Sequence, residues 1–368
     1  MPVLKRPLKR PSAPEAKASK ISISKHDGFL IASLKQYVGR LPPGQRKVLE
    51  ANISRPDGIS LASACTGSGM PEAVHSCVHR LFGKPARVLY ACEKMGWKRE
   101  FYKHTVVPHL HEKSGCIFED ICDLPNGVGK CDSHGQSCFV PDVAPNFFVC
   151  GFSCKDFSKL SSSFVGHEKA SVLSGNRGTT GNTFNAMAAH IKRTLPACVV
   201  LENVADLDMS DDDGVAPNMD FLYELLEVCG YVLNHNLFWS STFGLPQRRK
   251  RIFVVGLHKS TFDLSTVSAQ SLLREVLDIT AKLQHPMWSL DKFLLDESHP
   301  RVQSEMTRAM EATSDMGVGV GEWPSFHREF LRSKGLNYQD IHAPREMLDN
   351  RWFDLLPRRS KQCVMVVL

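Results

Sequence analysis

Short apolar segments alternate with amphipathic segments along the middle of the chain. Apolar runs typical of buried strands occupy residues 59–64, 87–93, 117–121, 146–152, 198–204 and 251–257. Apolar residues at helical spacing occur between some of these runs, over 71–82, 182–194 and 219–228. Strands that alternate with helices in this way predict βαβ units, and therefore an α/β fold with a doubly wound, mostly parallel sheet.

The segments on either side of this region are less regular. Residues 26–58 carry apolar residues at mixed helical spacing, interrupted at Pro42 and Pro43, and predict short N-terminal helices. Beyond residue 257 the pattern loosens into helical segments and the glycine-rich stretch DMGVGVGEW. We therefore expect a main domain over 59–257 and a smaller, irregular C-terminal region over 258–368.

Composition and charge narrow the class of protein. With 42% hydrophobic residues the chain can bury a sizeable core, and no apolar run approaches the roughly 18 residues of a membrane span, so no membrane partner is expected. The formal net charge of +6 equals the basic excess within residues 1–25, a Pro- and Ser-containing tail that we expect to be disordered. Its KRPLKR segment fits a nuclear-import signal or a phosphate-contacting arm, with a solvated leader as the plain alternative. We expect a nuclear location, with an organelle as the alternative.

Ligands of such a sheet bind outside the carboxyl ends of its strands. Gly67 and Gly69 follow the first strand and allow a ligand to approach the backbone closely. Glu93 ends the second strand, where an acid can accept hydrogen bonds from a ribose diol, and Asp120 ends the third, where it suits an adenine amino group. These three strand ends favour a ligand that contains adenosine, without saying which one. An ordinary tight turn is the alternative for the glycines.

The fourth strand end, NFFVCGFSCKDFS, contains two cysteines of different character. Cys150 lies inside the apolar run and is predicted to be buried, whereas Cys154 follows in a turn with polar neighbours. The positive charge of Lys155 favours a thiolate, so Cys154 is placed like a nucleophile. A structural cysteine is the alternative.

Two later segments carry charged residues beside strands. Glu202 comes directly after an apolar strand, and the segment PQRRKR leads directly into the last one. Because alternate residues of an extended segment share a face, Gln247, Arg249 and Arg251 are expected to point the same way. Solvated surface charges are the alternative for both segments.

Taken in order, these motifs resemble the DNA (cytosine-5) methyltransferases, motifs I to VIII, over residues 59–256. The resemblance implies a Rossmann-like fold, S-adenosylmethionine as cofactor, DNA as partner, and methyl transfer to C5 of cytosine through a covalent bond between a cysteine and C6. It implies that the catalytic residues are Cys154, Glu202, Arg249 and Arg251. The cofactor contacts implied are Thr66, Gly67, Gly69, Glu93, Asp120 and Ile121. The substrate contacts implied are Ser158, Asn203 and Gln247.

The sequence departs from the family pattern at two places. Family members commonly have Pro-Cys-Gln at the nucleophile, and the RNA-modifying branch has Cys-Phe-Thr, whereas this chain has Ser153-Cys154-Lys155. No segment before Leu368 matches the ninth and tenth motifs, so we expect the 258–368 region to be a truncated target-recognition region. The alternative is that residues 26–58 close the cofactor pocket.

Three other functions are considered. A catalytically silent relative that binds nucleic acid would account for the altered neighbours of Cys154, and an RNA cytosine-5 methyltransferase also remains open. A nicotinamide-dependent enzyme would explain the glycines and Glu93, but it leaves the ENV and Q-x-R-x-R segments without a role.

The chain contains 12 cysteines, which we interpret as thiols because the first 25 residues lack the apolar run of a secretory signal. Cys131, His134 and Cys138 have a spacing that suggests a metal, with Cys116 and Cys122 upstream. Paired C-x-x-C half-sites are absent from the sequence, however. We therefore favour a polar loop over a zinc site and expect no metal.

Overall fold

The computed structural model describes residues 31, 34–55, 58–110, 115–157, 172–209, 217–290, 294–296 and 298–315. The predictions for the tail, for Ser158 and for the C-terminal region beyond residue 315 lie outside these ranges. Contacts divide the chain into one unit over Met1–Met287 and a second over Trp288–Leu368. In the second unit the described residues include helix α10 (Pro300–Asp315).

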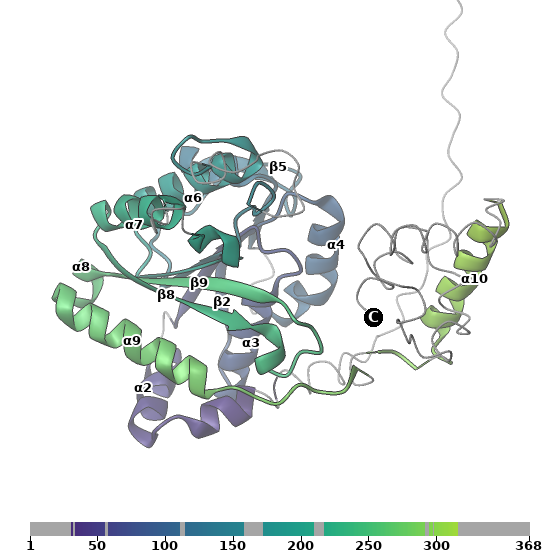
Figure 1. Ribbon diagram of the computed structural model, residues 1–368, viewed down its shortest axis with the longest axis horizontal. Helices are drawn as coiled ribbons and strands as arrows, with labels where there is room; N and C mark the ends of the chain where they lie inside the picture. Colours follow the sequence, from purple (N-terminus) through teal and green to yellow (C-terminus); the bar gives the residue numbers. More distant parts are fainter. Residues whose placement is uncertain are drawn as a thin grey trace, which may run out of the picture. The chain divides into compact units, whose positions relative to one another are not determined.

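The first unit is built on a nine-stranded sheet in the order β5-β4-β3-β2-β1-β6-β7-β9-β8 (Figure 1). Its inner strands are β1 (Ser60–Ala64), β2 (Arg87–Cys92), β3 (Cys116–Phe118), β6 (Phe147–Cys150) and β7 (Cys198–Val204). Neighbours among these inner strands pair in parallel. The predicted α/β fold with a doubly wound, mostly parallel sheet is confirmed.

The two edges of the sheet are antiparallel. At one edge, β4 (Val128–Cys131) and β5 (Gln136–Phe139) form a hairpin that pairs with β3. At the other edge, β9 (Lys250–His258) runs antiparallel to both β7 and β8 (Tyr231–Trp239). The apolar pattern did not predict β4, β5 or β8. In β8 the polar segment from Asn234 to Asn236 divides what would otherwise be an apolar run.

Helices cover both faces of the sheet. One face carries α3 (Met70–Leu81), α4 (Gly96–Thr105) and α9 (Thr266–Lys282), and the other carries α6 (Gly178–Thr194) and α7 (Pro217–Val228) (Figure 1). Successive strand residues point to opposite faces. Leu61 therefore packs with Tyr102 of α4, while its neighbour Ala62 joins the larger core with Phe184 of α6.

Helix α9 extends the first unit beyond the boundary predicted at residue 257. Its buried residues Ala269 and Leu273 pack with Val232 of β8 and Leu257 of β9. The division between the units falls after Met287 because this apolar face of α9 is part of the sheet's core. We describe residues up to 287 as one domain for this reason.

The remaining described elements are short or peripheral. Residues 34–40 are helical and α2 spans Pro43–Ile53. The short elements are η1 (Val107–His109), η2 (Ile121–Asn126), η3 (Ala205–Asp208), η4 (Ser240–Thr242) and α8 (Lys259–Phe262). Among the described residues, no helix combines the length and apolar character that crossing a bilayer requires.

The loop between β1 and α3 depends on its two glycines for different reasons. Both have a left-handed backbone, with φ of 64° at Gly67 and 78° at Gly69. A Cβ added to Gly69 would clash with the ring of Tyr102, whereas one added to Gly67 would have no heavy atom within 4 Å. Gly69 therefore allows α4 to pack against the loop, and Gly67 leaves its outer side open.

We expect Gly69→Ala to destabilise the domain more than Gly67→Ala. Both substitutions place a Cβ on a left-handed backbone, at a cost of about 1–2 kcal/mol. Only Gly69→Ala also overpacks against Tyr102, which adds about 1–3 kcal/mol. Urea unfolding of the two variants measures the difference, and equal losses of unfolding free energy would contradict the packing described here.

Candidate functional site

The predicted residues at the ends of β1 and β2 are joined by hydrogen bonds. The backbone N–H of Gly67 donates to Glu93 Oε2 at 2.8 Å, and the N–H of Met95 donates to Glu93 Oε1 at 3.0 Å. Glu93 is buried, with 5% of its surface exposed. A carboxylate accepts up to about four hydrogen bonds. Glu93 therefore fixes the glycine loop and keeps acceptor capacity for a ligand.

Asp120 is held at the end of β3 by two donors. The Cys122 N–H donates to Oδ1 at 3.0 Å and Lys94 Nζ to Oδ2 at 2.9 Å. Burial alone would raise the pKa of Asp120, but the Cys122 N–H and the Lys94 ammonium outweigh it, so this pKa lies below its ordinary value. Asp120 is thus an ionised acceptor at neutral pH, and its side chain is 31% exposed.

Two of the predicted cofactor residues, Thr66 and Ile121, have side chains that already contact other parts of the protein. The Thr66 hydroxyl donates to Glu72 Oε2 at 2.7 Å. The Ile121 side chain is 4% exposed and belongs to the main hydrophobic core. A contact from either residue to a ligand would have to come from the backbone.

Glu72 is a buried acid that the sequence analysis missed. Glu72 lies in the first turn of α3, which follows the glycine loop. Its carboxyl accepts hydrogen bonds from the hydroxyls of Ser63 and Thr66. Burial raises the pKa of Glu72, although the two hydroxyl groups lower it. The spacing of Glu72, Ser76 and His79 on the buried side of α3 is a helical polar stripe, and it is the signal that could have indicated this residue.

The turn that carries Cys154 is anchored by its neighbours. Phe152 and Phe157 are each 2% exposed, whereas Cys154 is half-buried. The Asp156 N–H donates to the Thr180 hydroxyl at 3.0 Å, and the Thr180 N–H donates back to Asp156 at 2.8 Å. The turn is thus fixed to the start of α6 while the thiol stays accessible. The structure places Cys150 in the core with none of its surface exposed, as predicted.

Asn203 has a different position from the one expected of a substrate contact. It is 2% exposed, its amide nitrogen donates to the Phe152 carbonyl at 3.1 Å, and its amide oxygen accepts from the Val204 N–H at 2.8 Å. Both ends of the amide are therefore occupied by backbone. Asn203 therefore holds the turn of Cys154 against β7.

Glu202 lies beside that turn and pairs with the predicted arginines. The strands β6 and β7 pair in parallel with Cys150 opposite Leu201, so Gly151 and Glu202 follow side by side. A Cβ on Gly151 would lie 3.2 Å from Glu202 Oε2. Arg251 Nε is 2.9 Å from Glu202 Oε1, and an Arg249 terminal nitrogen is 3.9 Å from the same oxygen. Three of the predicted catalytic groups thus meet at this edge.

Part of the segment before β9 is exposed to solvent. Gln247 and Arg248 are exposed, and the Gln247 carbonyl accepts a hydrogen bond from the Ser240 hydroxyl at 2.5 Å. Arg249 and Arg251 also border an apolar cavity of about 430 Å³ whose walls include Phe238, Phe253 and Leu277. Arg251 therefore both lines this cavity and pairs with the Glu202 carboxylate.

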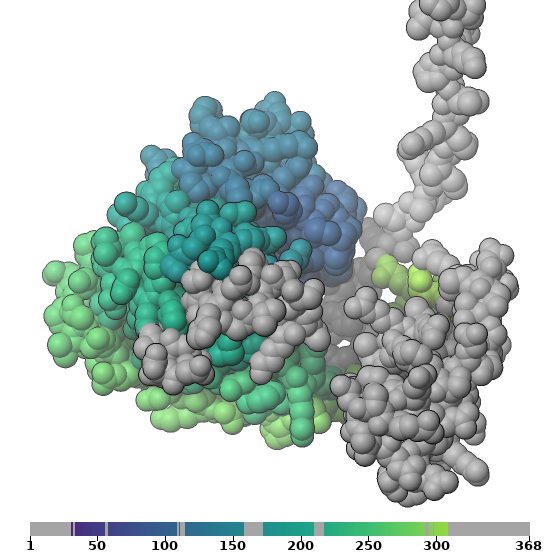
Figure 2. All heavy atoms as spheres, turned by 45° about the horizontal axis from the view of Figure 1, so that its top comes forward, coloured from purple at the N-terminus to yellow at the C-terminus, as the bar shows by residue number. Residues whose placement is uncertain are grey.

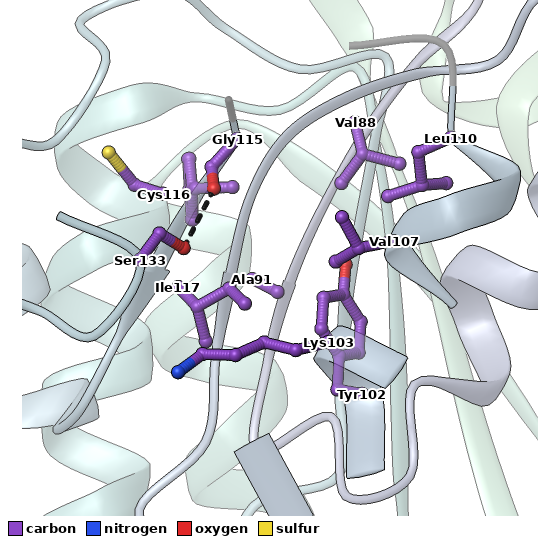
Figure 3. A pocket seen from close by; sticks show the side chains of 11 residues that line it. Val88, Ala91, Tyr102, Lys103, Val107, Leu110, Gly115, Cys116, Ile117 and Ser133 are labelled. Carbon is purple, nitrogen blue, oxygen red and sulfur yellow. Dashed lines mark hydrogen bonds between the residues drawn. The ribbon is translucent and has the colours of Figure 1, made fainter. Parts of the chain in front are cut away.

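A second cavity, of about 250 Å³, lies away from these residues (Figure 3). It is lined by residues of β2, β3, α4 and η1, among them Val88, Tyr102 and Ile117. Gly67, Glu93 and Cys154 do not belong to its lining. The predicted site is therefore an arrangement of loops at the carboxyl ends of the strands and not this cavity.

Fold and site together define a doubly wound α/β domain with an accessible thiol, a carboxylate and two guanidinium groups at neighbouring strand ends. The chain belongs to the C-5 cytosine-specific DNA methylase family, whose sequence profile matches residues 127–342, more than half of the chain. The matched range contains Cys154, Glu202, Arg249 and Arg251. The family inferred from the sequence motifs is thus confirmed.

Individual relatives match smaller parts of the chain. Type II methyltransferase M.SsoII of Shigella sonnei is 32% identical over 138 residues, which cover 37% of this chain and 31% of that protein. DNA (cytosine-5-)-methyltransferase DMT5 of Verticillium dahliae is 25% identical over 307 residues, which cover 70% of this chain and 12% of that protein. The match to the bacterial protein thus spans about a third of its length. The solved Dnmt2 methyltransferase of S. pombe aligns over 54% of this chain and 49% of its own, with 15% identity and a TM-score of 0.34.

The buried Glu72 predicts a pH dependence of stability. In the unfolded chain an ordinary Glu titrates near about pH 4.3. The folded protein binds the Glu72 proton more tightly, so the stability due to this group falls as pH rises from about 4.3 towards the raised folded pKa. In Glu72→Gln this dependence is absent, because the amide does not titrate.

Urea unfolding from about pH 4 upwards compares the wild type with Glu72→Gln. The unfolding free energy of the wild type minus that of the variant should decrease with pH, by up to about 1.4 kcal/mol per pH unit. A difference that stays constant or increases with pH would contradict the burial of this carboxyl.

Proposed function

We propose that the chain carries the catalytic domain of an S-adenosylmethionine-dependent DNA (cytosine-5) methyltransferase. Membership of the C-5 cytosine-specific DNA methylase family supports this function, as do the names of the bacterial and fungal relatives. The observation that carries the proposal is the arrangement of Cys154 in an anchored, half-buried turn beside the paired Glu202 and Arg251. These groups come from β6, β7 and β9, which lie side by side in the sheet.

The residues at the ends of β1, β2 and β3 fit the proposed cofactor. The open side of Gly67 lets a ligand approach the loop, Glu93 has acceptor capacity for ribose hydroxyls, and Asp120 can accept from an adenine amino group. When bound, S-adenosylmethionine supplies an electrophilic methyl group on its sulfonium. Gly69 contributes by packing against α4 and so supports the loop from behind.

Cys154 is proposed as the nucleophile that makes cytosine C5 reactive. Its thiolate adds to C6 of the ring, and the electron pair of the C5–C6 bond becomes available at C5 to attack the methyl group. Loss of the C5 proton then reforms the double bond and expels the thiol. Since C6 is not accessible inside a duplex, the base must be flipped out, at a cost of a few kcal/mol.

Glu202 is proposed to hold the N3 and amino edge of the same base. A proton shared with N3 neutralises the charge that thiolate addition would otherwise leave on the ring. Arg251 Nε lies 2.9 Å from Oε1 in an ion pair, so its charge orients the carboxyl group, and Oε2 lies on the side of Gly151. Asn203 supports this arrangement indirectly, because it fixes the Phe152 backbone two residues before Cys154.

A covalent adduct should form on Cys154 with a duplex that contains 5-fluorocytosine. The fluorine cannot leave C5 as a proton does, so the enzyme stays bonded to C6 after methyl transfer. Intact-mass measurement with saturating S-adenosylmethionine should show the adduct for the wild type and for Cys229→Ser, whose substituted thiol lies just after α7. Cys154→Ser should show none.

Absence of an adduct on the wild type under these conditions would contradict the proposed mechanism. A parallel assay with labelled cofactor compares the DNA duplex with an RNA of the same sequence. Transfer to the RNA alone would contradict DNA as the substrate, and transfer to neither would contradict the enzymatic function of this chain.

Replacement of Glu202 by glutamine should lower the rate of transfer while leaving the fold intact. Glutamine keeps an oxygen for Arg251 but has no proton to share with N3, so kcat should fall by about 10²–10⁴-fold. The exposed Glu224→Gln on α7 serves as the control and should keep the wild-type rate. A kcat for Glu202→Gln within about twofold of wild type would contradict this role.

A further inference from the structure

Four metal-ligating side chains meet at the edge of the sheet away from β7 and β9. They are Cys116, Cys131, His134 and Cys138, and their ligand atoms all lie within 4.8 Å of one another. Cys116 begins β3, Cys131 ends β4, His134 lies in the turn of the hairpin, and Cys138 lies in β5. The described domain thus brings a thiol from β3 to a hairpin more than ten residues later in the chain.

Hydrogen bonding alone does not account for this cluster. The sulfurs of Cys116, Cys131 and Cys138 lie 3.7, 3.2 and 3.4 Å from the same atom, His134 Nδ1. A ring nitrogen offers either one hydrogen or one lone pair, so it can satisfy only one of the three sulfurs at a time. A cation among the four atoms would interact with all of them.

The distances agree with tetrahedral coordination. Zinc binds sulfur at about 2.3 Å and imidazole nitrogen at about 2.0–2.1 Å, which places sulfur and nitrogen ligands about 3.6 Å apart in a tetrahedron. The three sulfur–nitrogen distances, 3.2–3.7 Å, lie close to this value. Three thiolates and one imidazole favour zinc over hard cations such as magnesium or calcium.

Two hydrogen bonds to backbone carbonyls connect the hairpin to β3 and to the residue before it, beside the ligands. The Ser133 hydroxyl donates to the Gly115 carbonyl at 3.1 Å, which links the residue before His134 to the residue before Cys116 (Figure 3). The Asp132 N–H donates to the Ile117 carbonyl at 2.8 Å. Cys116 also belongs to the lining of the smaller cavity, and in Figure 3 its sulfur points away from Tyr102 and Val107.

We propose that Cys116, Cys131, His134 and Cys138 bind one structural zinc ion. Four protein ligands complete a tetrahedron and leave no open position, which is typical of structural and not of catalytic zinc. The geometry therefore favours the zinc site that the sequence analysis ranked below a polar loop. The spacing alone was inconclusive because the fourth ligand, Cys116, comes from a different strand.

The site would fasten the edge of the sheet next to the proposed cofactor residues. Figure 2 shows the segment that carries the four ligands, drawn in blue, at the surface of the domain. Arg99 Nε lies 3.5 Å from Asp132, beside Cys131, and its Nη1 donates to the Glu93 carbonyl at 3.0 Å. The hairpin is therefore connected to the backbone of Glu93, and metal loss should loosen this end of the domain.

The test is the metal content of the full chain, purified under reducing conditions without chelator. Mass spectrometry of the metals should find one zinc per chain in the wild type and in Cys122→Ser, whose thiol is exposed and outside the cluster. Cys138→Ser, at the outer strand of the hairpin, should lose the zinc or bind it much more weakly in competition with a chromophoric chelator. Circular dichroism establishes that each variant is folded.

A second measurement needs no variant of the cluster. Wild-type protein stripped of metal and titrated with Co²⁺ should develop the visible bands of tetrahedral cobalt and a near-ultraviolet thiolate charge-transfer band, saturating at one equivalent. Zinc should displace the cobalt, and metal removal should lower the melting temperature. These readouts do not depend on methyl transfer, so their failure is distinguishable from failure of the proposed function.

Three results would overturn the proposal. The first is folded wild-type protein that contains no zinc and gives no tetrahedral cobalt spectrum. The second is Cys138→Ser that binds zinc as tightly as the wild type. The third is a disulfide between two of the three cysteines in the reduced preparation, because those sulfurs could not then act as thiolate ligands.

Discussion

The parallel register of β6 and β7 is the constraint on which the site depends. With Cys150 opposite Leu201, the chain leaves β6 at Gly151 at the level where Glu202 projects from β7. A side chain at Gly151 would meet the Glu202 carboxylate at 3.2 Å, so glycine permits the close approach. A shift of one residue would turn Glu202 to the other face of the sheet and away from Arg251. Pairing between buried strands thus determines which charged groups meet.

Opposite charges then stabilise an arrangement that neither strand could hold alone. Arg251 of β9 pairs with Val204 of β7, so it is the diagonal neighbour of Glu202 on the same face of the sheet. This places Arg251 Nε 2.9 Å from the Glu202 carboxylate. Both groups keep part of their surface exposed, with 23% for Arg251 and 32% for Glu202. A pair in such surroundings contributes little to stability, about 0–1 kcal/mol at the surface. Its importance lies in the orientation of the carboxyl group.

The sequence pattern could predict the inner part of the fold because buried parallel strands are continuous apolar runs. The runs around Ala62, Phe148 and Val199 became inner strands of the sheet as expected. The edges were not predictable in the same way, since β5 is mostly exposed and β8 contains polar residues from Asn234 to Asn236. Partners across the sheet, and not local pattern, make these segments strands.

The same distinction applies to the site. Cys154 could be separated from Cys150 by its polar neighbours, and the arginines by their place before a strand. The cluster around His134 ranked low because it depends on Cys116, 18 residues earlier in the chain. Glu72 was missed although its helical spacing with Ser76 and His79 is a local signal, because its hydroxyl partner Ser63 is on a different element. The sequence also could not show that the Asn203 amide is occupied by the Phe152 carbonyl and the Val204 N–H.

The central claim is that Cys154, Glu202 and Arg251 act on one base at the carboxyl ends of β6 and β7. The most direct measurement is a crystal structure of the chain trapped on a 5-fluorocytosine duplex with the spent cofactor. We expect a bond between Cys154 Sγ and C6 of a flipped base, with Glu202 at hydrogen-bonding distance from N3 and Arg251 still paired with Glu202. A base bound elsewhere, or one held there with Cys154 unbonded and Glu202 turned away, would contradict it.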